Sequence, residues 1–167
     1  MAAPALGARR WRTVRASACL CPANDSTARK RPEPRHLPHL ATLAARHPDL
    51  HIVIDHGGKP EIAGAQWQLW ADDMERLATT TGVLCKLSGL LTEAGPNQGT
   101  DAVRRYGAHL LACFGAPRLV WDSDWRVLEL AANCRDWWTE TATLLSGCSP
   151  GERAAVLGGN AVRFYRL

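Results

Sequence analysis

Hydrophobic residues recur every three or four positions in several stretches after residue 36, which is the spacing of one face of an α-helix. Pro48 ends the first stretch, Gly82 ends the second, and Asp101 is the predicted N-cap of the third. Ser149, with Glu152 three residues later, predicts a capping box at the start of a short further helix. The longer predicted helices cover residues 37–47, 67–81, 101–114 and 128–145.

Compact apolar runs alternate with these helices and predict buried strands. The runs lie at residues 51–55, 83–87 and 118–121. Strands that are separated by helices through short links form right-handed crossovers and a parallel sheet. The predicted fold class is therefore α/β, with about three to four parallel strands and flanking helices.

In the first 35 residues the apolar positions follow neither the period of a helix nor that of a strand, and Pro32 and Pro34 break any helix there. A short strand within residues 13–21 is compatible with the sequence. The rest of 1–35 is predicted to be a poorly ordered lead-in to one domain over residues 36–167. The lead-in is also basic: residues 1–36 carry a net charge of +6, which leaves −2 of the total +4 for the remainder. No basic face is therefore expected on the folded domain, and no nucleic-acid partner.

The six cysteines are dispersed and include no Cys-x-x-Cys pair, which is typical of free thiols in a reducing compartment. No apolar run approaches the ~20 residues of a membrane-spanning helix, so no membrane partner is expected. The first 24 residues lack the long apolar stretch of a secretory signal. The predicted location is cytoplasmic, with an Arg-rich transit peptide as the alternative.

Polar residues follow each predicted strand at its carboxyl end, where parallel α/β folds bind their ligands. His56 precedes Gly57-Gly58, which permit a sharp turn. Its imidazole is suited to ligating a metal or polarising a carbonyl, or else to a structural bond with a loop. Asp124 is suited to metal binding or to activating water, or else to capping the next helix. For Asp122, helix capping is the favoured interpretation.

Lys86 interrupts an otherwise apolar strand, so its ammonium must face the lumen of a barrel, an ion-pair partner or solvent. A structural ion pair is favoured over a role in binding substrate. Four tryptophans fall at predicted helix positions and are interpreted as packing residues: Trp67, Trp70, Trp137 and Trp138.

Four blocks of sequence follow one another along the chain at the spacing of βα units. They are Ile54-Asp55-His56-Gly57-Gly58-Lys59-Pro60, then Cys85-Lys86-Leu87-Ser88-Gly89, then Ser123-Asp124-Trp125, and finally Gly158-Gly159-Asn160-Ala161 with Phe164-Tyr165. Together they resemble the amidohydrolase-related (amidohydrolase family 2) proteins, in particular the fuconolactonase-like and dicarboxylate-lactonase branch. The resemblance covers about residues 36–167. It implies the C-terminal half of a TIM-type (β/α) barrel, with the predicted strands as the sixth, seventh and eighth.

The same resemblance implies a hydrolase whose small-molecule substrate is a sugar lactone or a similar cyclic ester. Asp124 corresponds to the family's base on hydrolytic water, and His56 to a residue that contacts metal or substrate. Both are thus candidate ligands of a divalent metal, zinc or manganese, with a metal-free site as the alternative. Lys86, Ser88 and Trp125 are the implied substrate-binding residues.

Two positions depart from the family pattern beside the expected base. Asp122 stands where the family usually has glycine, and Arg126 stands where it usually has proline. The extra carboxylate is expected to raise the pKa of Asp124 unless Arg126 offsets it.

The family's first strand carries His-x-His, and this sequence contains none. Thirty-five residues cannot hold four βα units of roughly 30 residues each. The expectation is a truncated chain. The alternative to an active lactonase is then a catalytically silent half barrel that requires a partner or forms a homo-oligomer through its exposed sheet edges. A third hypothesis is that residues 1–36 form a basic arm that binds an acidic partner.

Overall fold

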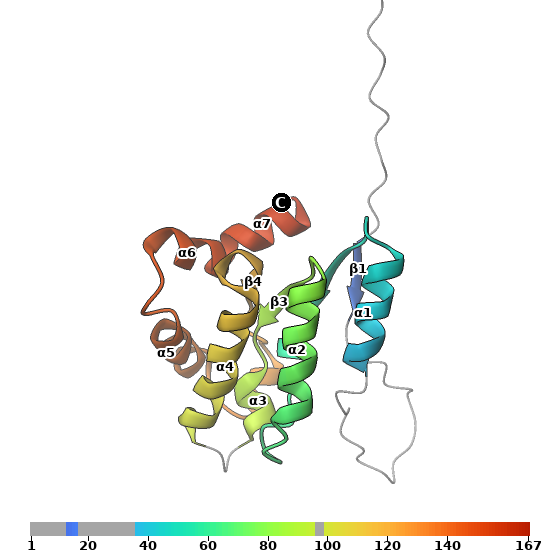
Figure 1. Ribbon diagram of the computed structural model, residues 1–167. Coiled ribbons are helices and arrows are strands. Elements are labelled where there is room, and N and C mark those ends of the chain that lie inside the picture. The colour runs from blue at the N-terminus through green and yellow to red at the C-terminus, as the bar shows by residue number, and fades with distance from the viewer. Residues whose placement is uncertain (1–12, 17–35, 96–98) are drawn as a thin grey trace, which may run out of the picture.

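A four-stranded parallel sheet forms the centre of the computed structural model, which describes residues 13–16, 36–95 and 99–167 (Figure 1). Neighbouring strands pair in chain order, and helices connect β2 to β3 and β3 to β4. The prediction of an α/β fold with a parallel sheet is confirmed. The strands are β1 (Thr13–Ala16), β2 (His51–Ile54), β3 (Leu84–Leu87) and β4 (Leu119–Trp121).

Strand β1 belongs to the segment that was expected to be a poorly ordered lead-in. It pairs with β2 in parallel, with Thr13 opposite His51 and Ala16 opposite Ile54. Its four residues therefore fall within the short strand that the sequence allowed. The rest of the lead-in, including residues 17–21, lies outside the described residues.

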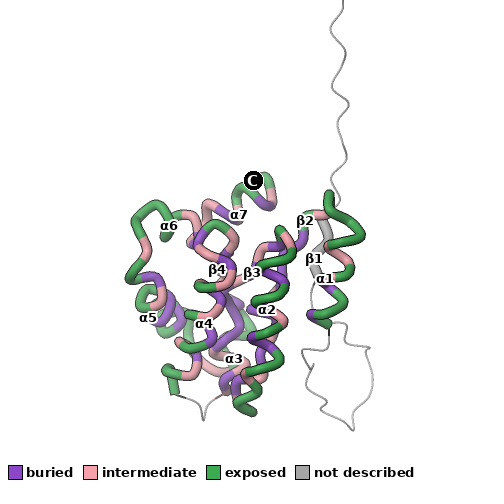
Figure 2. Tube along the Cα trace, viewed as in Figure 1, coloured by how far each residue is buried: buried purple, intermediate pink, exposed green. Residues whose placement is uncertain are grey.

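Helices α1, α2 and α4 lie side by side over one face of the sheet (Figure 1). The main core lies between these helices and the strands, where buried residues gather in Figure 2. On α2, the side chains of Trp70, Met74 and Leu77 have no exposed surface. Regular packing of this kind explains why the apolar periodicity predicted these helices well. They span Leu37–Arg46 (α1), Gln68–Thr80 (α2) and Thr100–Phe114 (α4), and a short α3 covers Leu90–Ala94.

Side chains alternate between the two faces of the sheet. Ile54 and Leu87 point into the core beneath the helices. Val53 and Val120 are also buried but lie outside that core cluster, on the opposite face. Lys86 pairs in register with Val120 and so shares this opposite face. The lysine therefore projects away from the helices, on the side that a closed barrel would make its lumen.

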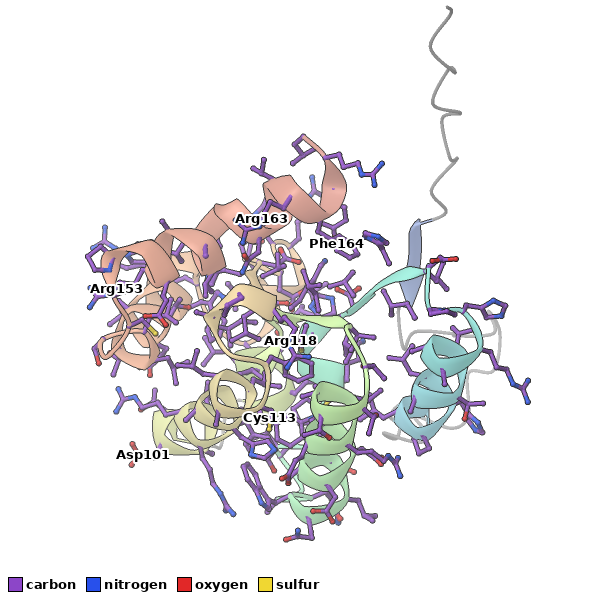
Figure 3. The ribbon with its side chains drawn as sticks, turned by 45° about the horizontal axis from the view of Figure 1, so that its top comes forward. Asp101, Cys113, Arg118, Arg153, Arg163 and Phe164 are labelled. Atoms are coloured by element: carbon purple, nitrogen blue, oxygen red, sulfur yellow. The ribbon has the colours of Figure 1, made fainter. Side chains whose placement is uncertain are left out.

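Arg118 anchors the start of β4 to the ends of the neighbouring helices (Figure 3). Its guanidinium donates hydrogen bonds to the carbonyl oxygens of Ala78 (2.8 Å), Thr81 (3.1 Å) and Phe114 (3.2 Å). These carbonyls lie at helix C-termini, where a cation is favourable. Asn160 completes the anchor, since its amide donates to Leu119 O at 2.6 Å.

Two predicted features of the helices are wrong. The segment predicted as one helix over 128–145 is a 3-10 turn, Val127–Leu130, followed by a separate helix α5, Cys134–Leu144. Asn133 begins the second helix, because its side chain accepts a hydrogen bond from the backbone N–H of Asp136 (3.0 Å). Asp101 is not an N-cap: α4 begins at Thr100, after Gly99.

The C-terminal segment consists of α6 (Pro150–Ala154), a π turn (Ala155–Gly159) and α7 (Asn160–Tyr165). Trp137 is buried, and Trp138, although 48% exposed, packs edge-on against Trp121 with ring centroids 5.8 Å apart, so both are packing residues as expected. None of the helices in the described ranges combines the length and the apolar character needed to cross a membrane.

The predicted capping box at α6 is confirmed, and it yields a stability prediction. The Ser149 hydroxyl accepts from Glu152 N–H (3.3 Å), while the Glu152 carboxylate accepts from Ser149 N–H (2.8 Å). None of the residues of α6 is buried, so the helix depends on its cap. Ser149→Ala should lower the free energy of unfolding by about 1 kcal/mol, measured by urea denaturation. Ser146→Ala, at an exposed position without this cap, is the matched control, and an equal loss in both variants would contradict the prediction.

Candidate functional site

Polar side chains from three neighbouring strands meet at the carboxyl end of the sheet. His56 directly follows Asp55 after β2, Lys86 and Ser88 lie at the end of β3, and Asp124 follows β4. The ends of parallel strands share one edge of a sheet, which brings these residues together. The predicted site residues are thus collected at one rim, apart from Trp125.

His56 occupies a sharp turn that presents its imidazole at the strand tip. Its φ angle is +47° and that of Gly57 is +58°, both in the left-handed region. Trp70 Nε1 donates to the Gly57 carbonyl at 2.8 Å and holds the turn against α2. The His56 Nδ1 atom lies 2.9 Å from the hydroxyl oxygen of Ser88, which is fully buried. Strained backbone of this kind at a polar cluster is typical of functional sites.

Asp124 approaches the same imidazole from the end of β4. Its Oδ1 lies 3.6 Å from His56 Nδ1, and its Oδ2 accepts a hydrogen bond from the Thr92 hydroxyl at 3.4 Å. The backbone of Asp124 is also left-handed, with a φ of +56°. The residue is buried, with 8% of its surface exposed. The predicted juxtaposition of His56 and Asp124 at one rim is therefore present in the structure.

The pKa of Asp124 is raised above that of an ordinary aspartate. Burial is the main cause, because it disfavours the charged carboxylate, while the His56 imidazole and the Thr92 hydrogen bond oppose it. Asp122 contributes to the rise, as the sequence predicted. The Arg126 guanidinium lies over the Trp125 ring, 5.0 Å from its centroid.

Lys86 bridges the carboxylates that flank this pair. Its Nζ lies 2.9 Å from Asp55 Oδ1 and 2.9 Å from Asp122 Oδ2. Burial disfavours the ammonium, but its hydrogen bond to Asp122 and its ion pair with Asp55 outweigh that effect and raise the pKa of Lys86. Burial acts on Asp122 as well, and the bond from Lys86 more than offsets it, so the pKa of Asp122 is lowered. The ion pair favoured from the sequence is thus what the structure contains.

Asp122 does not cap the following helix, contrary to the sequence interpretation. Its Oδ2 accepts from Lys86, and its Oδ1 accepts from the backbone N–H of Asp124 at 3.3 Å. The second contact closes a tight local turn at the end of β4. Asp122 therefore shapes the loop that carries the candidate base.

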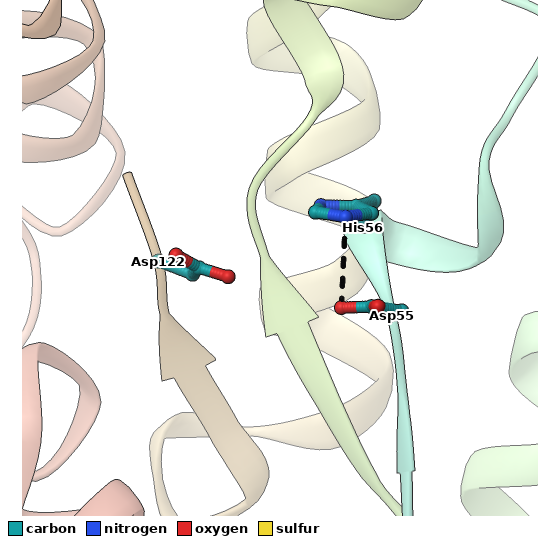
Figure 4. Close-up of side chains that lie close together, drawn as sticks. All are labelled: Asp55, His56 and Asp122. Carbon is teal, nitrogen blue, oxygen red and sulfur yellow. Dashed lines mark ion pairs between the residues drawn. The ribbon is translucent and has the colours of Figure 1, made fainter. Parts of the chain in front are cut away.

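Three groups at this rim have the composition of a metal site. Asp55, His56 and Asp122 each offer a ligand atom, and these atoms lie within 4.8 Å of one another (Figure 4). Lys86 places its positive charge between the two carboxylates, so the cluster as arranged does not fit a metal ion. Asp124, one of the two expected ligands, is not a member of the cluster. His56 and Asp124 supply two ligands, fewer than the three protein ligands of a catalytic zinc.

Trp125 lies farther out than the other predicted site residues. Its side chain is 64% exposed, and its Nε1 donates to Glu129 at 3.1 Å. Sequence reasoning missed Thr92, which lies on α3, a helix too short to show a periodic pattern. It also missed that Asp55 belongs to the site, although alternation along β2 places Asp55 on the same face as Val53.

Relatives of known sequence match most of this chain. A chain from Burkholderia ambifaria named L-fucono-1,5-lactonase is 46% identical over 138 residues, which cover 80% of this chain and 48% of the relative. A chain of the same name from Burkholderia multivorans is 36% identical over 148 residues, covering 80% and 49%. The chain therefore spans about half the length of the curated relatives that it matches.

Solved structures show the same relationship. An amidohydrolase from Burkholderia multivorans, crystallised with bound zinc, superposes with a TM-score of 0.73 at 36% identity, covering 80% of this chain and 50% of that one. A putative 2-pyrone-4,6-dicarboxylic acid hydrolase from Pseudomonas putida gives 0.58 at 28% identity, covering 78% and 49%. The parallel sheet and its helices thus form part of a TIM-type barrel, as predicted. Since the sequence profile of the amidohydrolase family (Amidohydro_2) also matches residues 26–167, the chain belongs to that family.

Proposed function

We propose that this chain hydrolyses a sugar lactone, with Asp124 activating water and His56 polarising the lactone carbonyl. The observation that carries the proposal is the approach of His56 Nδ1 to within 3.6 Å of Asp124 Oδ1 at the carboxyl ends of β2 and β4. A buried carboxylate with a raised pKa is a better proton acceptor than an exposed one. The lactonase relatives support a cyclic ester as the substrate class.

The proposed reaction begins with transfer of a proton from water to the Asp124 carboxylate. The water oxygen forms a bond to the lactone carbonyl carbon, and the ring C–O bond then breaks. The proton held by Asp124 passes to the departing ring oxygen, which leaves an open-chain hydroxy acid. If Ser88 donates its hydroxyl hydrogen to His56 Nδ1, the single N–H of the neutral imidazole is on Nε2, where it can bond the carbonyl oxygen.

The remaining expectations about the site are proposals of the same kind. The exposed ring of Trp125 offers a flat apolar surface for a sugar ring. Lys86 positions Asp122, and Ser88 positions His56, so both affect substrate binding through the residue that they contact. Zinc or manganese at His56 and Asp124 would require at least one further protein ligand. We place the protein in the cytoplasm, in keeping with the four free cysteines among the residues that the structure describes.

A catalytically silent half barrel is the second candidate. Within the described sheet, β1 and β4 are the outer strands, and each has a neighbour on one side alone. Unpaired edges are templates for pairing with another chain. Self-association through them would supply further strands, and light scattering after size exclusion measures the assembly that results.

The test is a lactone-hydrolysis assay, following acid release from a sugar 1,5-lactone with a pH indicator. His56→Gln should lower kcat/KM by about 100-fold or more, because it removes the group that polarises the carbonyl. His47→Gln is the matched control, since His47 is exposed at the C-terminal end of α1, next to the amino end of β2 and so at the opposite end of the sheet from the rim. Absence of turnover by the unsubstituted chain would favour the silent half barrel, and full activity of His56→Gln would overturn the proposed role.

A further inference from the structure

We propose that the Lys86 ammonium serves as the built-in cation of the Asp55–His56–Asp122 cluster and keeps divalent metals out of it. This inference does not depend on the identity of the substrate. It concerns a group of residues whose composition suits a metal but whose arrangement is already complete without one.

The ammonium occupies the position that a shared cation would take. Its Nζ is 2.9 Å from one oxygen of each carboxylate, so Asp55 and Asp122, from different strands, are drawn toward a single positive charge. The Asp55 Oδ1 atom is buried and accepts no aligned hydrogen bond from the described residues, so the ion pair with Lys86 is what compensates it. An uncompensated buried carboxylate is strongly disfavoured.

The backbone fixes this arrangement. Lys86 lies within β3, between β2 and β4, and is in register with Val120 of β4. Asp122 lies two residues after Val120 of β4, and Asp55 lies one residue after Ile54 of β2. The two carboxylates therefore lie on either side of Lys86. The side chain of Lys86 is 14% exposed, so it has little room to swing out and admit an ion. A divalent ion among the three ligands would lie within a few ångströms of the ammonium and be repelled by it.

Removing the ammonium should therefore create a metal site. Lys86→Met keeps a long apolar side chain but leaves two carboxylates and an imidazole facing one another. Mn²⁺ is the appropriate probe because it prefers oxygen and imidazole ligands over the thiolates of this cysteine-containing chain. Free Mn²⁺ is measured by electron paramagnetic resonance during titration of the full chain. We expect Lys86→Met to bind one Mn²⁺ about 10- to 100-fold more tightly than the unsubstituted protein.

Two further variants make the result specific. Lys86→Arg keeps the positive charge and should bind Mn²⁺ no better than the unsubstituted chain. Adding Asp122→Asn to Lys86→Met should abolish the gain. A folded Lys86→Met protein without tighter binding would overturn the proposal. If Lys86→Met does not fold, the unsubstituted chain decides: binding that disappears in Asp122→Asn would overturn the proposal, and the absence of Asp122-dependent binding would support it.

Discussion

Asp124→Asn should lower kcat/KM for lactone hydrolysis by about 10²- to 10⁴-fold, the usual contribution of a positioned general base. The amide fills the same space and can still accept the hydrogen bond from Thr92. It cannot take a proton from water. The loss should therefore appear in turnover and not in folding, and parallel measurement of initial rates and of urea denaturation separates the two.

The raised pKa of Asp124 also predicts how stability and activity change with pH. Because the pKa of Asp124 is raised in the folded chain, its protonated form is the one that the fold favours. Its contribution to stability is fully present below the pKa of the unfolded chain and is lost as pH rises through the folded pKa. Activity should run the opposite way and increase over that range as the base ionises. Asp124→Asn should remove both effects and should not lower the free energy of unfolding at neutral pH.

Asp49→Asn is the control for the loss of a negative charge. Asp49 is exposed in the link between α1 and β2, outside the rim that holds His56 and Asp124. This variant should keep both the rate and its pH profile. Retention of more than one-tenth of the activity by Asp124→Asn would rule out the proposed base.

Residues at strand ends could be assigned to the site from the sequence because topology alone brings them together. His56 and Asp124 follow apolar runs, and parallel strands end at one edge, so their proximity required no knowledge of side-chain conformation. The contact of Lys86 with two carboxylates was harder to predict. It depends on the register of β3 with β4, which a run of apolar residues does not reveal.

Elements with weak local signals were harder to predict for a related reason. The sequence allowed a short strand within residues 13–21 without a clear pattern for it, because β1 gains its hydrogen bonds from β2. The break before α5 depends on the side chain of Asn133, which caps a new helix within a continuous helical spacing. The existence of β1 and the start of α5 thus depend on strand pairing and on one capping hydrogen bond, neither of which the spacing of apolar residues reveals.

Gly89→Ala should impair stability and activity together, because this glycine lies directly against the candidate site. Its φ is +73°, and a β-carbon added there would lie 2.7 Å from the β-carbon of His56. That atom is fixed by the backbone, so no rotation of the imidazole relieves the clash. We expect the free energy of unfolding to fall by about 2–4 kcal/mol, combining left-handed strain with overpacking. A displacement of His56 by about 1 Å should lower kcat/KM by about 100-fold.

Gly95→Ala separates the two causes. Gly95 also has a positive φ, +68°, but a β-carbon there meets no atom within 4 Å. It should therefore lose stability through backbone strain while its folded fraction keeps normal turnover. Assays are run well below the unfolding transition of each variant, so that rates refer to folded protein. Equal kcat/KM values for the two variants would mean that the contact between Gly89 and His56 does not set the position of the imidazole.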